Sequence, residues 1–543
     1  MKIIKKLFGS VIALAMAFAL TISVSAASIT VESDNFDGRT FVAYQVFKGS
    51  KVTNNTLEGI DWGNGIQKDA FLIALKNSKD FGTENPFASA TSAADVANVL
   101  KDWQQMNDSN AIAFAQLAYT HRNESNKKPF TNGQLNDVEV GYYLIVDTTE
   151  TLPDGEAKNP AILKVVGDEV VTPKTEKVTI DKMVKGENDT DFKNDTSSSV
   201  GKIVDFRFSS TIPIQSTLNQ YTVYKWTFTD TMSKGLDPVK NTDGSLKVEV
   251  KIGDSIATTG YTVSSIVDTT DGGKSFTVTF ENLKAIEGIA GKTITVSYQA
   301  KVTEDAIASE DGTVDSVNNN VKLDYSNNPN DNTSTGEIDD DVKVFTFQLE
   351  GTKVNDKEQT DTLEGAEFML YKTVKDSNPE QKEYAVIDST GKITKWNTLS
   401  DEAVKEYLDA KDSVDYVGPN YTITSNDDGK FNVTGLGDGT YFLKETKAPE
   451  GYIAPNDPFK IEITSKQSNN MMDTLTIKLD GKQVEGGGNP STGIVTGTFV
   501  NTSSMTLPET GGMGTTMLYV IGGVLLVGSA ILLITKKRMS NEG

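Results

Sequence analysis

Three polar residues occupy positions where the surrounding pattern predicts a buried, apolar face. Lys182, Asp230 and Asn319 each alternate with apolar residues at a spacing of two, and side chains two apart share one face of a β-strand. Lysine is almost never fully buried without a partner. The apolar residues in phase with these three are Val178, Ile180, Val184, Trp226, Phe228, Val321, Leu323 and Tyr325.

A second set of the same three types follows later in the chain. Lys353 is in phase with Phe347 and Leu349, and Glu445 and Asn501 also alternate with apolar or aromatic residues. Taken singly, each residue of the two sets fits an edge position or a hydrogen-bonded polar group in a core. Their repeated occurrence together is less easily explained in that way. We expect the lysine on the first strand of its domain, the acid on a middle strand and the asparagine on the last strand.

A lysine, an acid and an asparagine in one core can form a covalent bond. Burial disfavours the charged amine and lowers its pKa, which leaves a nucleophile, and burial raises the pKa of a carboxylic acid. An acid that stays protonated can donate a hydrogen bond and polarise the asparagine carboxamide. Attack by the amine then releases ammonia and leaves an intramolecular amide. The fixed geometry of the folded core would promote this reaction without a separate enzyme. Asp230 and Glu445 are the candidate catalytic acids.

Both ends of the chain carry targeting patterns. Lys2, Lys5 and Lys6 precede an apolar run over 7–24 that ends in small residues, so 1–27 is expected to be a signal peptide cleaved after Ala26 or Ala27. The uncharged run over 517–535 would be roughly 28 Å long as a helix, which is close to the thickness of a bilayer core. The basic residues Lys536, Lys537 and Arg538 hold its far end on the cytoplasmic side. By itself this is an ordinary membrane anchor.

Composition narrows the function classes. The net charge of -23 and the pI near 4.6 argue against nucleic-acid binding, and the absence of cysteine excludes disulfides and thiolate metal sites. With His121 as the only histidine, most Ser-His and Cys-His schemes are excluded. We expect no metal and no cofactor. A wall-anchored hydrolase that uses carboxylates alone stays open as an alternative.

Length and pattern predict a mainly β chain with about three domains and a C-terminal transmembrane helix. The expected boundaries are 28–174, 175–341 and 342–502, followed by 503–543. In the first domain we expect strands at 29–31, 39–47, 138–147 and 161–171, with helices between them at 66–75, 92–106 and 110–119. A short helix at 400–410 and a turn at 426–429 are expected in the third.

The C-terminal segment resembles a known signal. Leu507, Pro508, Glu509, Thr510 and Gly511, followed by the apolar run and the basic tail, resemble the cell-wall sorting signal of Gram-positive surface proteins. The resemblance implies that a sortase cleaves between Thr510 and Gly511 and passes the Thr510 carbonyl to an amine. It also implies export and attachment to the peptidoglycan cross-bridge.

The domains themselves resemble those of pilins. The sequence segments AYQVFKG and GYYLIVDTT are similar to segments of the N-terminal domains of Gram-positive pilins. The phrases LEGAEFMLY and YFLKETKAPEGY resemble the collagen-adhesin B-type repeat, and the second is the pilin E-box. The resemblance implies three tandem Ig-like, collagen-adhesin-type β-sandwich domains, the first with a helical insertion. It also implies spontaneous isopeptide bonds, Lys182 to Asn319 with Asp230 and Lys353 to Asn501 with Glu445.

Two assignments leave alternatives. Asn319 has Asn318 and Asn320 beside it, and it is chosen by phase and by the family pattern. Backbone pilins of this kind carry a motif ending in Tyr-Pro-Lys, whose lysine accepts the next subunit. Here Thr172 precedes Pro173 and Lys174, so the match is partial. Lys177 and Lys164 are competing acceptors, and Lys174 also fits an ordinary linker lysine.

The resemblance implies the major, backbone subunit of a covalent cell-surface pilus that serves adhesion and colonisation, and not an enzyme with turnover. A sortase would join Thr510 of one subunit to Lys174 of the next. The implied partners are a class C-type pilus sortase, a housekeeping sortase, other copies of the chain, minor pilins and a host extracellular-matrix ligand. A wall-anchored monomeric adhesin or a minor basal pilin is the alternative. The sequence identifies neither the host ligand nor the sortase. It leaves open whether the first domain has a crosslink and whether scattered Asp and Asn side chains bind a metal.

Overall fold

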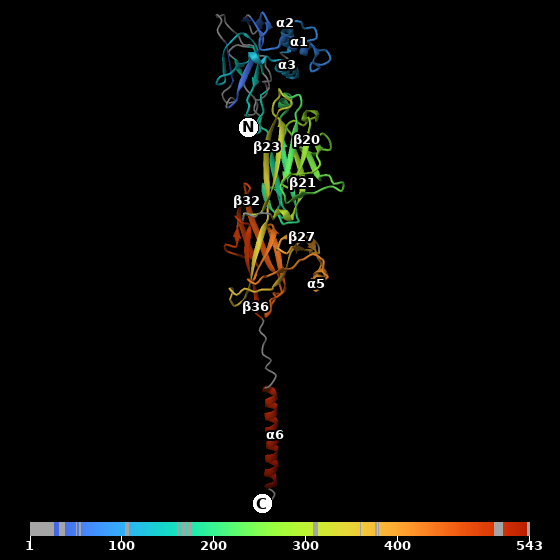
Figure 1. The fold of residues 1–543 in the computed structure, drawn as a ribbon, viewed down its shortest axis with the longest axis vertical. Helices are drawn as coiled ribbons and strands as arrows, with labels where there is room; N and C mark the ends of the chain where they lie inside the picture. The colour runs from blue at the N-terminus through green and yellow to red at the C-terminus, as the bar shows by residue number, and fades with distance from the viewer. Residues whose placement is uncertain are drawn as a thin grey trace, which may run out of the picture.

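The computed structural model confirms a mainly β chain with a helical excursion near its start and an apolar helix at its end. Figure 1 shows three domains in a row along the long axis, with α6 beyond the third. The structure describes residues 27–31, 38–49, 51–53, 56–103, 108–159, 162–165, 169–171, 176–307, 313–358, 360–374, 377, 379–503 and 514–539.

The first domain contains two sheets and a group of helices. The small sheet has the order β10-β1-β7 and the larger one β5-β2-β8-β9, with β6 also paired to β2. The short strands β3 and β4 form a separate hairpin. The bounds are β1 Ala27–Val31, β2 Phe41–Lys48, β3 Lys51–Thr53, β4 Thr56–Glu58, β5 Asp61–Trp62, β6 Lys128–Pro129, β7 Gln134–Val138, β8 Gly141–Asp147, β9 Ile162–Val165 and β10 Glu169–Val171.

The helices of this domain cover one face of the larger sheet. They are α1 (Lys68–Asn77), α2 (Ala93–Asp102) and α3 (Asp108–Thr120), each shifted by a few residues from the sequence expectation. Ser92 and Asp95 form a capping box that fixes the start of α2. One face of β2 and β8 packs against the helices and the other against the small sheet. Burial on both faces explains why these strands are apolar almost throughout.

The middle domain is a sandwich of two sheets. One sheet has the order β11-β13-β21-β16-β17, and the facing sheet has the order β12-β23-β22-β14-β20-β18. The main strands are β11 (Asp181–Lys185), β12 (Asp195–Ser197), β13 (Ile203–Thr211), β14 (Trp226–Met232), β16 (Val248–Ile252), β20 (Lys274–Phe280), β21 (Thr293–Val302), β22 (Ser316–Ser326) and β23 (Thr335–Phe345). The shorter elements are α4 (Gln215–Leu218), β15 (Leu236–Pro238), β17 (Ser255–Ile256), β18 (Thr262–Val263) and β19 (Val267–Asp268).

The third domain repeats the two-sheet plan. Its smaller sheet has the order β29-β24-β36-β31 and its larger sheet β27-β26-β25-β30-β32-β33-β34. The bounds are β24 Phe347–Asn355, β25 Glu367–Thr373, β26 Lys382–Ile387, β27 Ile393–Thr398, β28 Ile423–Thr424, β29 Lys430–Leu436, β30 Gly439–Lys447, β31 Tyr452–Ile453, β32 Phe459–Ser468, β33 Met471–Leu479, β34 Lys482–Gln483, β35 Gly488–Asn489 and β36 Ile494–Ser503. The expected helix is α5 (Asp401–Ala410), and Asn426 and Gly429 close the expected turn.

One sequence expectation about the middle domain is wrong. Asn319 was assigned to the last strand, but it lies on β22, and β23 follows and pairs with β22 along its whole length. β23 runs on to Phe345 and so crosses the boundary expected at residue 341. After Thr346 the chain enters β24 at Phe347. The two domains are thus joined by nearly continuous strand.

The domains contact one another along the row. The middle and third domains share one continuous hydrophobic cluster. Across this junction the Val200 backbone N–H donates to the Gly435 carbonyl (2.9 Å), and the Trp396 indole N–H donates to the Val200 carbonyl (2.9 Å). The first and middle domains are also joined by hydrogen bonds, among them one from the Lys158 N–H to the Asn327 carbonyl (2.7 Å).

The last helix is α6 (Gly514–Met539), and within it 517–538 is long and apolar enough to cross a membrane, with a mean hydropathy of 2.5. No part of that window is buried against the domains. The apolar run expected at 517–535 is therefore helical, and Lys536, Lys537 and Arg538 lie in its last turn.

Candidate functional site

The middle domain brings Lys182, Asp230 and Asn319 together from two facing sheets. Lys182 lies on β11, in the sheet formed with β13 and β21. Asp230 on β14 and Asn319 on β22 belong to the opposite sheet, where Asp230 pairs with Val321 and Asn319 with Met232. The acid and the amide are therefore diagonal neighbours on one face, and the lysine approaches them from across the core.

All three side chains are buried, with relative exposures of 1% for Lys182 and 0% for Asp230 and Asn319. The Lys182 Nζ forms an ion pair with Asp230 Oδ2. The rings of Phe206, Phe208 and Tyr298 surround this amine, with ring centroids 5.3–5.9 Å from Nζ. The amine thus has one charged partner in an otherwise aromatic pocket.

The electrostatics favour a neutral pair. Burial lowers the pKa of the Lys182 amine even though Asp230 opposes the shift. Burial likewise raises the pKa of the Asp230 carboxyl, against the opposing effects of Lys182 and a hydrogen bond from Tyr298. Both shifts move in the direction that yields a free amine and a protonated acid. These are the protonation states that attack on an amide requires.

Asn319 is the asparagine of its triplet that faces this core. The neighbouring Asn318 and Asn320 point to the other face of β22 and are partly exposed, as the alternation of a strand requires. The Asn320 side-chain N–H donates to Asp339 on β23 (3.2 Å), away from the lysine.

The third domain brings Lys353, Glu445 and Asn501 together with a different arrangement. Lys353 on β24 and Asn501 on β36 lie on neighbouring parallel strands of one sheet, and Asn501 is two residues beyond Phe499, the register partner of Lys353. Glu445 on β30 comes from the facing sheet. All three are buried.

The contacts in the third domain are direct. The Lys353 Nζ donates to the Asn501 Oδ1 and lies 3.1 Å from Glu445 Oε2. The Asn501 Nδ2 donates to Glu445 Oε1 (2.6 Å). Phe368 and Phe459 flank the amine, and burial lowers the pKa of Lys353 although Glu445 opposes the shift. The acid therefore bridges the amine and the amide.

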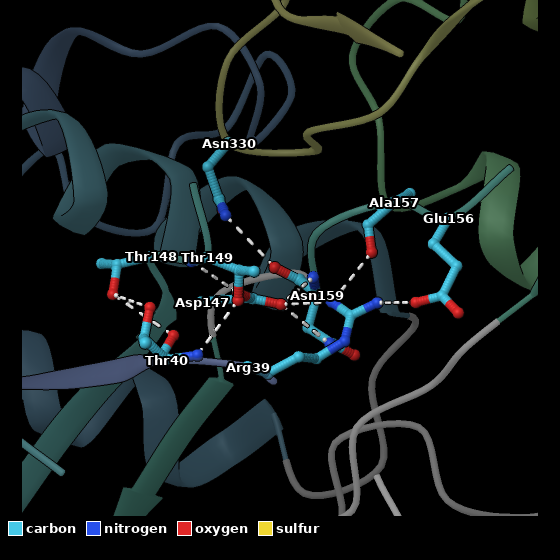
Figure 2. Close-up of polar contacts among 9 residues, drawn as sticks. All are labelled: Arg39, Thr40, Asp147, Thr148, Thr149, Glu156, Ala157, Asn159 and Asn330. Atoms are coloured by element: carbon cyan, nitrogen blue, oxygen red, sulfur yellow. Dashed lines mark hydrogen bonds and ion pairs between the residues drawn. The ribbon is translucent and has the colours of Figure 1, made fainter. Parts of the chain in front are cut away.

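The first domain holds a related cluster with arginine in place of lysine. Figure 2 shows Arg39, Asp147 and Asn159 converging. Arg39 Nη1 donates to Asp147 Oδ2 (2.7 Å), and both the backbone N–H and the Nδ2 of Asn159 donate to the same oxygen at 3.0 Å. Arg39 Nη2 also pairs with Glu156 (2.6 Å). Among the described residues of this domain, the buried polar set contains no lysine.

The Arg39 cluster is ionic and unreactive. Burial acts to raise the pKa of Asp147, but hydrogen bonds from Thr149 and Asn159 outweigh it and hold that pKa below its usual range. A guanidinium is not deprotonated in proteins and offers no free amine. The Asn159 carbonyl accepts a hydrogen bond from Asn330 of the middle domain (3.4 Å), so the cluster also touches the domain junction.

Several predicted site residues lie outside the described residues. These are Lys174, the sorting residues Leu507, Pro508, Glu509, Thr510 and Gly511, and the signal peptide up to Ala26. Of the competing acceptors, Lys164 lies on β9 opposite Tyr143, and Lys177 is exposed just before β11. In the described part of the chain, no group of three or more His, Cys, Asp or Glu residues is placed to hold a metal ion.

Sequence reasoning missed Tyr298 in the middle site and the Arg39 cluster in the first domain. Tyr298 lies in the middle site, but on β21 it alternates with Val296 and Ala300 and reads as an ordinary core aromatic residue. Arg39 and Asp147 are far apart in sequence, and neither lies in an alternating pattern that marks it as buried. Their clustering depends on the pairing of β2 with β8.

Comparison with known proteins identifies two of the domains. Residues 200–329 match the family model described as Gram-positive pilin backbone subunit 2, Cna-B-like domain. Residues 347–476 match the SpaA model, a prealbumin-like fold domain. The chain therefore carries a Gram-positive pilin backbone domain followed by a prealbumin-like SpaA domain. These two matches support a structural role as a subunit of a cell-surface pilus.

Solved structures of major pilins are similar in fold. The full-length major pilin SpaD of Corynebacterium diphtheriae is 18% identical, with a TM-score of 0.46 over 89% of this chain and 99% of that one. The backbone pilin of a Streptococcus pyogenes serotype is 16% identical, with a TM-score of 0.49 over 89% and 100%. The major pilin SpaA of Corynebacterium diphtheriae is 14% identical, with a TM-score of 0.43 over 88% and 100%. A search of curated protein sequences gave no match.

Proposed function

We propose that this chain is the backbone subunit of a covalent pilus whose middle and third domains each close an intramolecular isopeptide bond. The observation that carries the proposal is the pair of buried lysine, acid and asparagine sets, which lie in the two domains that match pilin models. In each set the amine contacts the acid, and the acid reaches the asparagine directly or through one hydroxyl.

The bond-forming step balances without a cofactor. The neutral lysine Nζ attacks the asparagine Cγ, the Cγ–Nδ2 bond breaks, and the amine gives up one proton for the proton that the leaving nitrogen takes. The products are a secondary amide and one molecule of ammonia. Preorganised geometry of this kind can supply about 7–11 kcal/mol of the barrier. The step happens once per site, so it is a maturation and not turnover.

The crosslinks would give a cysteine-free exported protein its robustness. Lys353 and Asn501 are 148 residues apart, and closing a loop of that size contributes roughly 5 kcal/mol in the chain-entropy model developed for disulfides. Lys182 and Asn319 enclose a loop of similar size. Mechanical force on such a domain would pass through the covalent crosslink and not through the hydrogen bonds between strands. Domains of this kind therefore suit a fibre under tension.

Polymerisation would use the junction between the first and middle domains and the C-terminal sorting signal. A class C-type pilus sortase would cleave between Thr510 and Gly511 and join the Thr510 carbonyl to the Lys174 amine of another copy. Such a head-to-tail contact extends into a filament unless it closes into a ring. A housekeeping sortase would transfer the finished polymer, with its minor pilins, to the peptidoglycan cross-bridge. Adhesion to a host matrix ligand would follow from this placement.

The test is expression of the full chain in a Gram-positive host that carries a pilus sortase. Extraction of the cell wall should give a ladder of covalent multimers, which Lys174→Ala and Thr510→Ala abolish and Lys177→Ala leaves intact. A single wall-linked species with native Lys174 would contradict polymerisation and favour the monomeric adhesin or basal pilin. A ladder that depends on Lys177 or Lys164 would keep the polymer and reassign its acceptor.

A further inference from the structure

A tyrosine links the acid to the amide in the middle site. Tyr298 is buried on β21, where its ring stacks on Phe206 (centroids 5.4 Å apart) and meets Phe276 edge-on (5.0 Å). Its hydroxyl donates to Asp230 Oδ1 (2.8 Å) and accepts from Asn319 Nδ2. The hydroxyl therefore touches the catalytic acid and the nitrogen that must leave.

The third site shows why a linking group is needed. Glu445 contacts Asn501 Nδ2 with one carboxyl oxygen and lies beside the amine with the other, so it serves both reacting groups directly. Asp230 is one methylene shorter, and its two carboxyl oxygens bond to Lys182 and to Tyr298. Its route to Asn319 runs through the phenol.

We propose that Tyr298 is a catalytic residue of the middle site and that its hydroxyl carries a proton between Asp230 and the departing amide nitrogen of Asn319. The inference rests on the proposed isopeptide function and adds a reacting group that the third site does not use. No residue of the third site's hydrogen-bonded set is a tyrosine.

The proton transfers balance around a closed path. For the transfer, the two hydrogen bonds described above reverse their direction. The neutral Asp230 carries its proton on Oδ1 and donates it to the Tyr298 oxygen, and the Tyr298 O–H turns toward Nδ2 once attack of the amine gives that nitrogen a free lone pair. As the Lys182 amine attacks Cγ, its proton passes to Asp230 Oδ2. The Oδ1 proton passes to the phenol oxygen, and the phenol proton passes to Nδ2, which leaves as ammonia. Tyr298 and Asp230 both end in the protonation state in which they began.

The surroundings of Asn319 agree with this route. Its Oδ1 has no hydrogen-bond partner among the described residues, so the amide is held from its nitrogen side by Tyr298. A tyrosine that served only to satisfy a buried carboxylate would need no contact with the amide. Among the residues that the structure describes, the Tyr298 hydroxyl is the one group that bonds to the leaving nitrogen.

The experiment follows both crosslinks in one molecule. The mature chain up to Thr510 is made by cell-free translation, and its intact mass and tryptic crosslinked peptides are recorded over time. Tyr298→Phe keeps the ring and removes the hydroxyl, and Tyr224→Phe, a buried tyrosine of the same core, is the matched control. We expect Tyr298→Phe to slow the middle bond at least about a hundredfold, the scale of general acid–base catalysis, and to leave the third bond at its normal rate.

The outcomes separate the two claims. Wild-type chain that loses no ammonia contradicts the proposed function itself. Wild-type chain that loses two ammonias, with Tyr298→Phe losing both at the same rate, overturns only the role of Tyr298. If proteolysis shows that Tyr298→Phe unfolds the middle domain, fluorotyrosine is incorporated instead, since it preserves shape and changes phenol acidity. If fluorotyrosine changes the rate at which the middle bond forms and leaves the rate of the third bond unchanged, the relay is supported. If the ratio of these two rates is the same in the fluorotyrosine protein and in the wild type, the relay is overturned.

Discussion

The middle and third domains place the same three residue types in their cores with different topology. In the middle domain the lysine faces its asparagine across the sandwich, so the proposed bond between Lys182 and Asn319 would join two sheets. In the third domain Lys353 and Asn501 lie on adjacent parallel strands, so the proposed bond would stay within one sheet. The acid sits beside the asparagine in the first case and opposite it in the second.

The proposed reaction therefore requires contact among the three groups, and it does not require a particular strand arrangement. A glutamate from the facing sheet reaches both reactants in the third domain, whereas an aspartate in the middle domain reaches the amide through Tyr298. The acid, its length and its neighbours therefore adapt to where the strands bring the amine and the amide.

The first domain marks the limit of this pattern. Its buried acid and asparagine, Asp147 and Asn159, surround Arg39, which stays charged and cannot attack an amide. Burial and a neighbouring acid are therefore not sufficient for the proposed bond, because the buried cation must also be able to lose a proton. We infer that this cluster holds the domain by ionic hydrogen bonds, in place of the covalent bond proposed for the other two domains.

The largest expected effect is loss of a crosslink on neutralising its acid. Asp230→Asn and Glu445→Gln keep the size of each side chain but remove the carboxyl that exchanges protons, so each should abolish the bond of its own domain only. The affected domain should lose roughly 5 kcal/mol of stability. Intact mass and calorimetry of the ectodomain measure both effects. Loss of both bonds from one substitution would show that the sites are not independent.

Arg39→Met should destabilise the first domain by about 3–5 kcal/mol, because it leaves Asp147 buried without its cation. The mass deficit of the ectodomain should not change, since no bond forms there. Limited proteolysis of the first domain gives the first result and mass spectrometry the second. A mass change in this variant would contradict the ionic interpretation.

The position of Asn319 on β22 leaves the hairpin of β22 and β23 outside the two closed loops. Asn319 pairs with Val342, so tension across the domains pulls at the open end of this hairpin and opens its hydrogen bonds one pair at a time. We expect an extension of roughly 80 Å before the covalent path is taut. Single-molecule pulling between Lys174→Cys and a cysteine added after Ser503 measures it, because the chain has no other cysteine. Complete extension of both domains would mean that the crosslinks are absent.

The smallest expected effect is the dependence of first-domain stability on pH. The folded pKa of Asp147 lies below its ordinary value of 3.8, so the unfolded first domain binds more protons in acid. Its contribution to stability is therefore complete above that ordinary value and is lost as the pH falls through the lower folded pKa. Melting of the first domain between neutral and strongly acidic pH should show this decline, and Arg39→Met should weaken it. A first domain that melts at the same temperature throughout this range would contradict the prediction.

Much of the architecture follows from alternation in the sequence. The period of two placed Lys182 and Asp230 on core-facing strand positions, and it selected Asn319 over its neighbours. The alternation did not show that β23 follows β22 in the same domain. An alternating strand after a turn is equally consistent with the first strand of the next domain. The alternation also could not identify the role of Tyr298. A core tyrosine whose hydroxyl bonds to an acid has the same sequence pattern as one that only packs in the core.

The most direct test of the account is the intact mass of the mature ectodomain up to Thr510. The two buried sets predict a mass lower than the sequence mass by two molecules of ammonia, with the crosslinked peptides joining Lys182 to Asn319 and Lys353 to Asn501. A mass equal to that of the unmodified sequence would contradict the account, because both lysines would then be structural ion-pair partners.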